Sequence, residues 1–302
     1  MNSLIKMNNV YRNKTIKIYF FALTAILLYG LTPVITKLAV GFTDGITVGA
    51  LRALVALPIA LLIIICWKIS LPWHGYDKWL LVLSGICGLA IFPIFFSWGI
   101  QMTTAGHAAA ATASAAVMAG AFDAVINRKW PNIYWWGGIA IGLVGVLLLI
   151  WEAVGLGVEG VSWQGDTLVF AGMFSGVVGY IAGAKLTHKV GAISVSLWSV
   201  CVAAIFLCPV IVWNTDLSTL LQIDLRGWVA ICTLAWGITI GAYILWNRAV
   251  ADGGIARIGS LQLLQPVIGI SLAPLLLSEP FTLTLLIATI ITLFGVFLIQ
   301  HK

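Results

Sequence analysis

The sequence predicts an all-α integral membrane protein with ten transmembrane helices, arranged as two inverted five-helix repeats. Three observations support this fold class: the composition, the spacing of the apolar runs and the placement of the charged residues. Of the 302 residues, 61% are hydrophobic and only 9% are charged, whereas a soluble domain has roughly 25% charged residues. A chain with so few charges is suited to a lipid bilayer, which we expect to surround most of its surface.

The apolar residues form runs of the length that a membrane requires. A helix needs about 20 mostly apolar residues to cross the hydrocarbon core of a bilayer. The chain divides at its charged and turn-rich stretches into ten such runs, at residues 18–40, 45–67, 78–100, 105–126, 132–153, 164–186, 191–213, 226–249, 255–277 and 281–300. The longest polar interruptions, around residues 155–164 and 214–226, are ordinary connections. They leave no room for a separate soluble domain.

The charged residues predict the orientation of the chain. If the N-terminus is cytoplasmic and each run crosses once, most lysines and arginines fall at cytoplasmic ends, and most acidic residues fall at the opposite ends. This is the positive-inside pattern. It predicts that both termini are cytoplasmic, that residues 1–17 form a cytoplasmic segment, and that the first helix is retained. The net charge of +6 then reflects topology, so we expect no nucleic-acid partner.

The two halves of the chain resemble each other at a spacing of about 150 residues. Residues 143–150 read LVGVLLLI, and residues 293–300 read LFGVFLIQ. We therefore expect a first repeat over residues 18–153 and a second over residues 164–300. Because each half holds five crossings, an odd number, the second copy must enter the membrane from the opposite face. Inverted repeats of this kind suit alternating access to a central site.

Several short motifs, in a fixed order, carry a likeness to a known family. The last two expected helices read QPV at residues 265–267, LLLSEP at 275–280 and LFGV at 293–296, and earlier matches are Arg52, Gly165-Asp166 and YILW at 243–246. In order and spacing these resemble the drug/metabolite transporter superfamily, in its ten-helix EamA-like branch of amino-acid and metabolite exporters. The resemblance covers essentially the whole chain. It implies a central cavity and the movement of small metabolites such as amino acids, often outward.

Polar and aromatic groups at membrane depth are the candidates for substrate binding, because exposing them to hydrocarbon is costly. Amides and hydroxyls can hold the carboxylate and ammonium of a zwitterion, and aromatic faces suit a cation or an apolar side chain. We expect a cavity lined by Thr32, Trp98, Thr112, Tyr180, Trp198, Trp236, Tyr243, Trp246, Gln262 and Gln265. For the two glutamines, a hydrogen bond between helices is the alternative.

Four further residues are candidates for a gating or structural role. Pro33 and Pro266 each remove a backbone donor within a run, which produces either a hinge or a simple kink. Arg52 carries a charge within a run and therefore needs a partner. Asp44 and Glu279 lie towards the same predicted side, so we expect Arg52 to form an outer ion pair rather than to bind an anion directly.

The function class follows from what the sequence contains and lacks. It has no HExxH, Walker A or GxSxG motif, so we expect no enzyme, no catalytic residue, no cofactor and no metal. The leading hypothesis is a secondary transporter that exports amino acids across the bacterial inner membrane. A multidrug or nucleobase carrier is the alternative, and a non-transporting membrane partner protein represents another class. The sequence leaves open whether transport is coupled to a proton or to a substrate gradient. It also leaves open whether the protein is a monomer or a homodimer.

His107 is the one histidine placed near the start of an expected helix on the outer side. Its side chain can titrate near neutral pH. We expect an interfacial polar residue, with proton coupling as the alternative.

Overall fold

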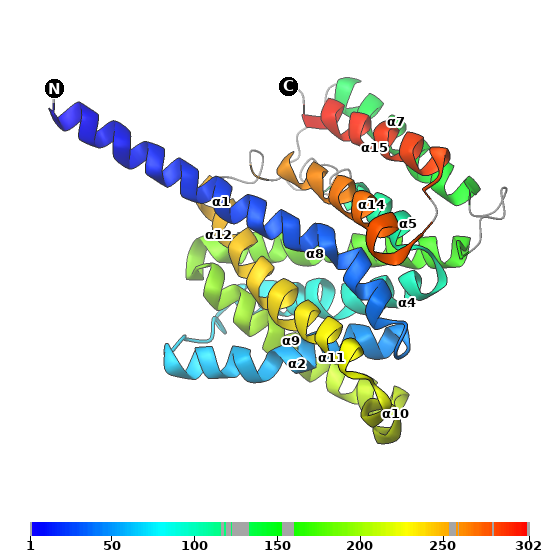
Figure 1. The fold of residues 1–302 in the computed structure, drawn as a ribbon. Coiled ribbons are helices and arrows are strands. Elements are labelled where there is room, and N and C mark those ends of the chain that lie inside the picture. Colours follow the sequence, from blue (N-terminus) through cyan, green and yellow to red (C-terminus); the bar gives the residue numbers. More distant parts are fainter. Residues whose placement is uncertain are drawn as a thin grey trace.

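The structure, a computed structural model, describes residues 2–115, 133–152, 160–253, 260–279 and 281–300, together with Met118, Phe122 and Ile258. Within these ranges the chain is helical and contains no strand (Figure 1). The all-α fold class predicted from the sequence is confirmed.

The first half of the chain begins with the longest helix and contains one π-helical segment. Its elements are α1 (Asn2–Ala39), α2 (Gly45–Cys66), α3 (Asp77–Leu83), the π-helix η1 (Ser84–Ile91), α4 (Phe92–Met102), α5 (Ala105–Thr112) and α7 (Ile133–Trp151). The first turns of α1 extend beyond the other helices (Figure 1).

The second half follows the same plan. Its elements are α8 (Trp163–Val190), α9 (Ala192–Asn214), α10 (Leu217–Gln222), α11 (Leu225–Cys232), the π-helix η3 (Thr233–Ala242), α12 (Tyr243–Gly253), the 3₁₀-helix η4 (Ser260–Leu263), α14 (Leu264–Leu277) and α15 (Leu283–Gln300). The π-helix η1 lies within the third expected run and η3 within the eighth, so the two occupy equivalent positions in the two halves.

Six helices in the described ranges are long and apolar enough to cross a membrane: Thr15–Ala39, Gly45–Cys66, Asp77–Met102, Trp163–Val190, Ala192–Asn214 and Leu225–Val250. Three shorter apolar helices are Ile133–Gly145, Leu264–Leu277 and Leu283–Gly295. The fourth expected run is represented by α5, and most of its remainder lies outside the described residues. Each expected run thus coincides, at least in part, with a described helix, while ten crossings stay a prediction.

Side-chain caps explain where several helices begin. Asp44 precedes α2 and accepts a hydrogen bond from the Thr47 amide at 2.9 Å. Thr104 precedes α5 and accepts a hydrogen bond from the His107 amide at 3.2 Å. Ser162 precedes α8 and accepts one from the Gly165 amide at 3.1 Å. Each cap satisfies a donor that the first turn of a helix leaves free.

The two halves are packed into each other. The segment formed by η1 and α4 packs on α8, and the matching segment formed by η3 and α12 packs on α1. In the same way α2 packs on α9, α5 on α14, and α7 on α15, the last pair lying side by side at one edge (Figure 1). Every one of these pairs joins one helix from each half, so the centre of the protein is built from both.

Close packing at the centre depends on glycine. A Cβ atom added to Gly179 of α8 would lie 2.2 Å from the backbone nitrogen of Gly88 and 2.4 Å from its Cα. Small residues allow helix backbones in a membrane to approach this closely. The contact brings α8 against η1, next to the cavity described below.

The prolines at membrane depth do not all break helices. Pro266 is the third residue of α14, and Pro93 is the second of α4, directly after η1. α14 follows directly on the 3₁₀-helix η4, as α4 does on η1, so each proline, which has no backbone donor, lies where the hydrogen-bond pattern of the helix changes. Pro33 is different because it lies inside α1, where it is buried, and a Cβ atom on Gly269 of α14 would be 3.6 Å from its Cγ.

Candidate functional site

A cavity lies between the two halves of the chain. It encloses about 930 Å³ of empty space, its opening included, and its wall is contributed by α1, α2, η1, α4, α5, α8, η3, α12, η4 and α14. Helices of both halves therefore shape the same space.

The cavity brings together most of the residues that the sequence singled out. Seven of the ten predicted substrate-binding residues line it: Thr32, Thr112, Tyr180, Tyr243, Trp246, Gln262 and Gln265. The cavity wall also contains residues that sequence reasoning did not select, among them Tyr29, Phe92, Phe96, Met173 and Thr239. Tyr29 and Thr239 are polar residues inside expected helices, so the criterion that selected the other residues, a polar group at membrane depth, could have selected them too.

The structure does not place the three remaining tryptophans in this wall. The indole nitrogen of Trp198 donates to the Ser70 carbonyl at 3.1 Å, and that of Trp236 donates to the Val55 carbonyl at 3.0 Å. Trp98 is half-buried where α4 meets α2. The position of these residues within their expected runs did not reveal which face of the helix each occupies.

An aromatic cluster forms one side of the cavity. Trp246 is 1% exposed, and its ring centroid lies 6.2 Å from that of Tyr29 and 6.1 Å from that of Tyr180. These separations fall within the range in which aromatic rings attract one another. The Tyr243 hydroxyl lies 3.0 Å from Ser84 Oγ, which in turn accepts from Ser199 Oγ at 3.1 Å. The ring of Tyr243 is therefore held in place by η1 and α9.

Arg52 lies in the wall of the cavity, and this corrects the expected outer ion pair. Its side chain is 3% exposed, and its Cζ is 5.9 Å from the centroid of the Phe92 ring. Asp44 precedes α2, so Arg52 lies about 12 Å further along the helix axis. In the described part of the chain no carboxylate forms an ion pair with Arg52.

The two carboxylates proposed as partners of Arg52 are used elsewhere. Asp44 accepts from the Thr47 amide and from Asn214 Nδ2 at 3.3 Å. Glu279 accepts from the amides of Ala105 and Gly106 at 2.8 and 3.0 Å. A carboxylate on the first amides of a helix is stabilised by the positive end of the helix dipole, so Glu279 fixes the start of α5.

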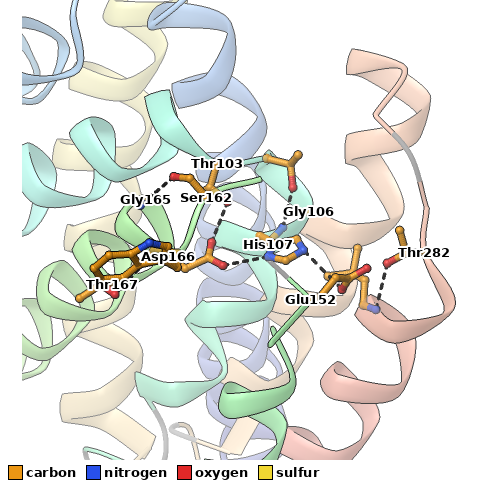
Figure 2. A network of polar contacts seen from close by, with 12 residues as sticks. Thr103, Gly106, His107, Glu152, Ser162, Gly165, Asp166, Thr167 and Thr282 are labelled. Atoms are coloured by element: carbon orange, nitrogen blue, oxygen red, sulfur yellow. Dashed lines mark hydrogen bonds and ion pairs between the residues drawn. The ribbon is translucent and has the colours of Figure 1, made fainter. Parts of the chain in front are cut away.

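A second group of polar residues lies away from the cavity, where α4, α5, α7 and α8 approach one another (Figure 2). We call it the His107 network: His107, Asp166, Glu152 and Thr103. His107 Nδ1 is 3.1 Å from Asp166 Oδ2, and His107 Nε2 is 3.5 Å from Glu152 Oε2. Thr103 Oγ1 donates to Asp166 Oδ1 at 2.7 Å. The imidazole, which lies between the two carboxylates, is 3% exposed.

The His107 network connects segments that are distant in sequence. Thr103 lies between α4 and α5, Asp166 is in the first turn of α8, and Glu152 follows α7. Beside it, the Lys37 ammonium of α1 donates to the carbonyls of Ile100, at 2.9 Å, and Thr103. The sequence predicted His107 as an interfacial residue, with proton coupling as the alternative, and did not group it with either carboxylate. The signal that could have grouped them is their shared position at the ends of expected helices on one side.

A bundle of apolar helices of membrane length, closed around a polar and aromatic cavity, defines a multi-pass membrane protein with a central site. The sequence model of the EamA-like transporter family matches the chain twice, over residues 16–151 and 163–300. The chain belongs to the EamA-like transporter family, and it is a membrane transporter rather than an enzyme.

Individual proteins support this assignment. The chain is 28% identical to the "Uncharacterized transporter YdeK" of Bacillus subtilis, over 88% of this chain and 91% of that one. It is 27% identical to a "Probable amino-acid metabolite efflux pump" of Salmonella typhimurium, over 92% and 93% of the two chains. A solved crystal structure matches with a TM-score of 0.66 at 17% identity, covering 93% of this chain and 94% of the other. At this level of sequence identity the structural match supports the fold and nothing more.

Proposed function

We propose that the chain is a secondary transporter that exports small metabolites, above all amino acids, across the cytoplasmic membrane by alternating access. The observation that carries this proposal is the central cavity, whose wall combines hydroxyl, amide and aromatic side chains from both halves. A site between two halves is where alternating-access transporters hold their substrates. Relatives from Salmonella typhimurium and Escherichia coli bear the name "Probable amino-acid metabolite efflux pump", which favours amino acids as the substrate class.

Alternating access requires two parts that can move against each other. We assign residues 18–153 and 164–300 to two inverted repeats. The double match of the family model, the equivalent π-helices η1 and η3, and the paired packing of the halves support this assignment. π-helical turns are frequent at functional sites, and residues of both, Gly88 and Thr239 among them, line the cavity.

The transport proposal is tested with purified protein in proteoliposomes. Vesicles are loaded with one unlabelled amino acid at a time, and the entry of the same labelled amino acid is followed. We expect counterflow of at least one amino acid above the rate of protein-free vesicles, because a carrier exchanges its substrate across the membrane. Vesicles that contain folded protein and exchange none of the 20 standard amino acids would refute the substrate class.

The proposed orientation makes a separate prediction. With both termini in the cytoplasm, the connection between α2 and α3 is cytoplasmic and the segment before α8 lies outside. Alkaline phosphatase fused after Gly75 should therefore be inactive and after Gly160 active, because this enzyme matures only outside the cytoplasm. Equal activity of the two fusions would contradict the orientation.

A further inference from the structure

The cavity carries an uncompensated positive charge. Among the described residues that line it, Arg52 is the only one with a formal charge, and the wall contains no aspartate or glutamate. Neither Asp44 nor Glu279 reaches it, as shown above. A buried charge without a partner is destabilising, and charges within membrane helices usually mark a functional site or a specific partner. A ligand with a negative charge would therefore supply the partner that Arg52 lacks.

Hydrogen-bond donors without partners are found in the same wall. The Arg52 Nε and Nη1 atoms, Trp246 Nε1 and Thr239 Oγ1 are buried and have no hydrogen-bond partner among the described residues. Guanidinium and indole nitrogens can only donate. A buried donor left unsatisfied costs about 1–3 kcal/mol, and more when it is charged. A ligand suited to this wall is therefore rich in acceptors.

We propose that Arg52 binds the carboxylate of the transported molecule, so that the cavity selects small carboxylates and zwitterions and excludes organic cations. A carboxylate supplies both the negative charge and the acceptors that the wall lacks, and guanidinium with carboxylate is among the strongest hydrogen-bonded pairs in proteins. A cation without a carboxylate would instead meet the charge of Arg52 at short range, in a medium of low dielectric.

The rest of the cavity fits the other parts of such a molecule. The faces of Tyr29, Tyr180 and Trp246 offer an ammonium group a favourable contact, as do the side-chain oxygens of the two glutamines in the wall. Phe96, Met173 and Val177 provide apolar surface for a side chain. This inference rests on the proposed function and specifies its substrate chemistry: the feature recognised in every substrate is the carboxylate.

The inference is tested by binding, which does not depend on transport. Purified wild-type protein is titrated by calorimetry with 3-phenylpropionate, a carboxylate without an ammonium, and with 2-phenylethylamine, an ammonium without a carboxylate. Phenylalanine, leucine and their amides complete the series. We expect each carboxylate to bind at least tenfold more tightly than its uncharged or cationic counterpart. Equal affinities within the pairs, or no binding of any carboxylate, would overturn the proposal.

Variants then assign the effect to one residue. Arg52→Gln should weaken carboxylate binding at least tenfold, while Arg52→Lys, which keeps the charge, should retain part of it. Arg226→Gln removes the same charge from an exposed position in α11 and should bind as the wild type does. Wild-type affinity in Arg52→Gln would refute the assignment. If Arg52→Gln does not fold, the affinity of Arg52→Lys and the ligand series on the wild type still test whether Arg52 binds the carboxylate.

The two proposals fail in different ways. If the protein exchanges no amino acid but binds 3-phenylpropionate through Arg52, the substrate class is wrong and the carboxylate site stands. If it exchanges amino acids and binds their amides equally well, transport stands and the role of Arg52 is wrong. If Arg52 acted only as a gate, Arg52→Gln would slow exchange and leave affinity unchanged, which would contradict the inference.

Discussion

Replacing Asp166 by alanine should lower the free energy of unfolding by about 3–5 kcal/mol, the usual cost of removing one partner from a buried ionic pair. The Asp166 carboxylate accepts from Thr103 Oγ1 and contacts the His107 ring, and the side chains of both Asp166 and His107 are 3% exposed. Without it the imidazole keeps only the longer contact to Glu152, and Thr103 loses its acceptor. Denaturant titration of the purified protein in detergent measures the loss.

A matched carboxylate provides the control. Asp252 pairs with Arg248 one helical turn away at 3.1 Å, and both side chains are exposed. Exposed pairs contribute about 0.2–1 kcal/mol, so Asp252→Ala should have a small effect. Asp166→Asn should fall between the two alanine variants, because its amide oxygen can still accept from Thr103. A loss in Asp166→Ala no larger than that in Asp252→Ala would show that the His107 network does not stabilise the protein.

The helices of this protein could be predicted because the bilayer determines their length and composition. The run expected at residues 164–186 is observed as α8, Trp163–Val190, and that at 191–213 as α9, Ala192–Asn214. Asp44, Thr104 and Ser162 supply the caps that determine where α2, α5 and α8 begin. These caps are local in sequence, so they need no tertiary information, although the start of α5 also receives the distant Glu279 carboxylate.

The face that each helix turns towards the cavity could not be predicted in the same way. Trp98 and Tyr243 are both aromatic residues inside an expected run, yet only Tyr243 reaches the cavity. An apolar helix in a membrane has apolar residues on all sides, so periodicity does not reveal its inner face. The π-helices η1 and η3 change the angular position of the residues that follow them, and the apolar pattern of the sequence predicts neither.

The partners of charged residues depend on packing between distant segments. Sequence reasoning identified Arg52 as a charge that needs a partner but assigned it to Asp44 or Glu279, because all three were expected near one side of the membrane. The structure places Arg52 two turns into α2, against the ring of Phe92. The contacts of His107 with Asp166 and Glu152 arise likewise from the packing of α5, α7 and α8.

Replacing Gln265 by leucine should reduce transport at least tenfold while the protein still folds and inserts. Gln265 lines the cavity near the start of α14. Loss of a hydrogen bond to a charged ligand group costs about 1.5–3 kcal/mol, or about 10- to 100-fold in affinity. Leucine is close to glutamine in size and makes the helix more apolar, so insertion should not suffer. Gln222→Leu, at an exposed position of α10, makes the same change away from the cavity.

The central claim is that substrates pass through the cavity between the two halves, and counterflow by these two variants tests it most directly. Wild type, Gln265→Leu and Gln222→Leu are reconstituted at equal density, and the exchange of one amino acid is measured at a concentration below half-saturation of the wild type. We predict wild-type exchange for Gln222→Leu and at least a tenfold slower rate for Gln265→Leu. Equal exchange rates in all three proteins would contradict a transport route through this cavity.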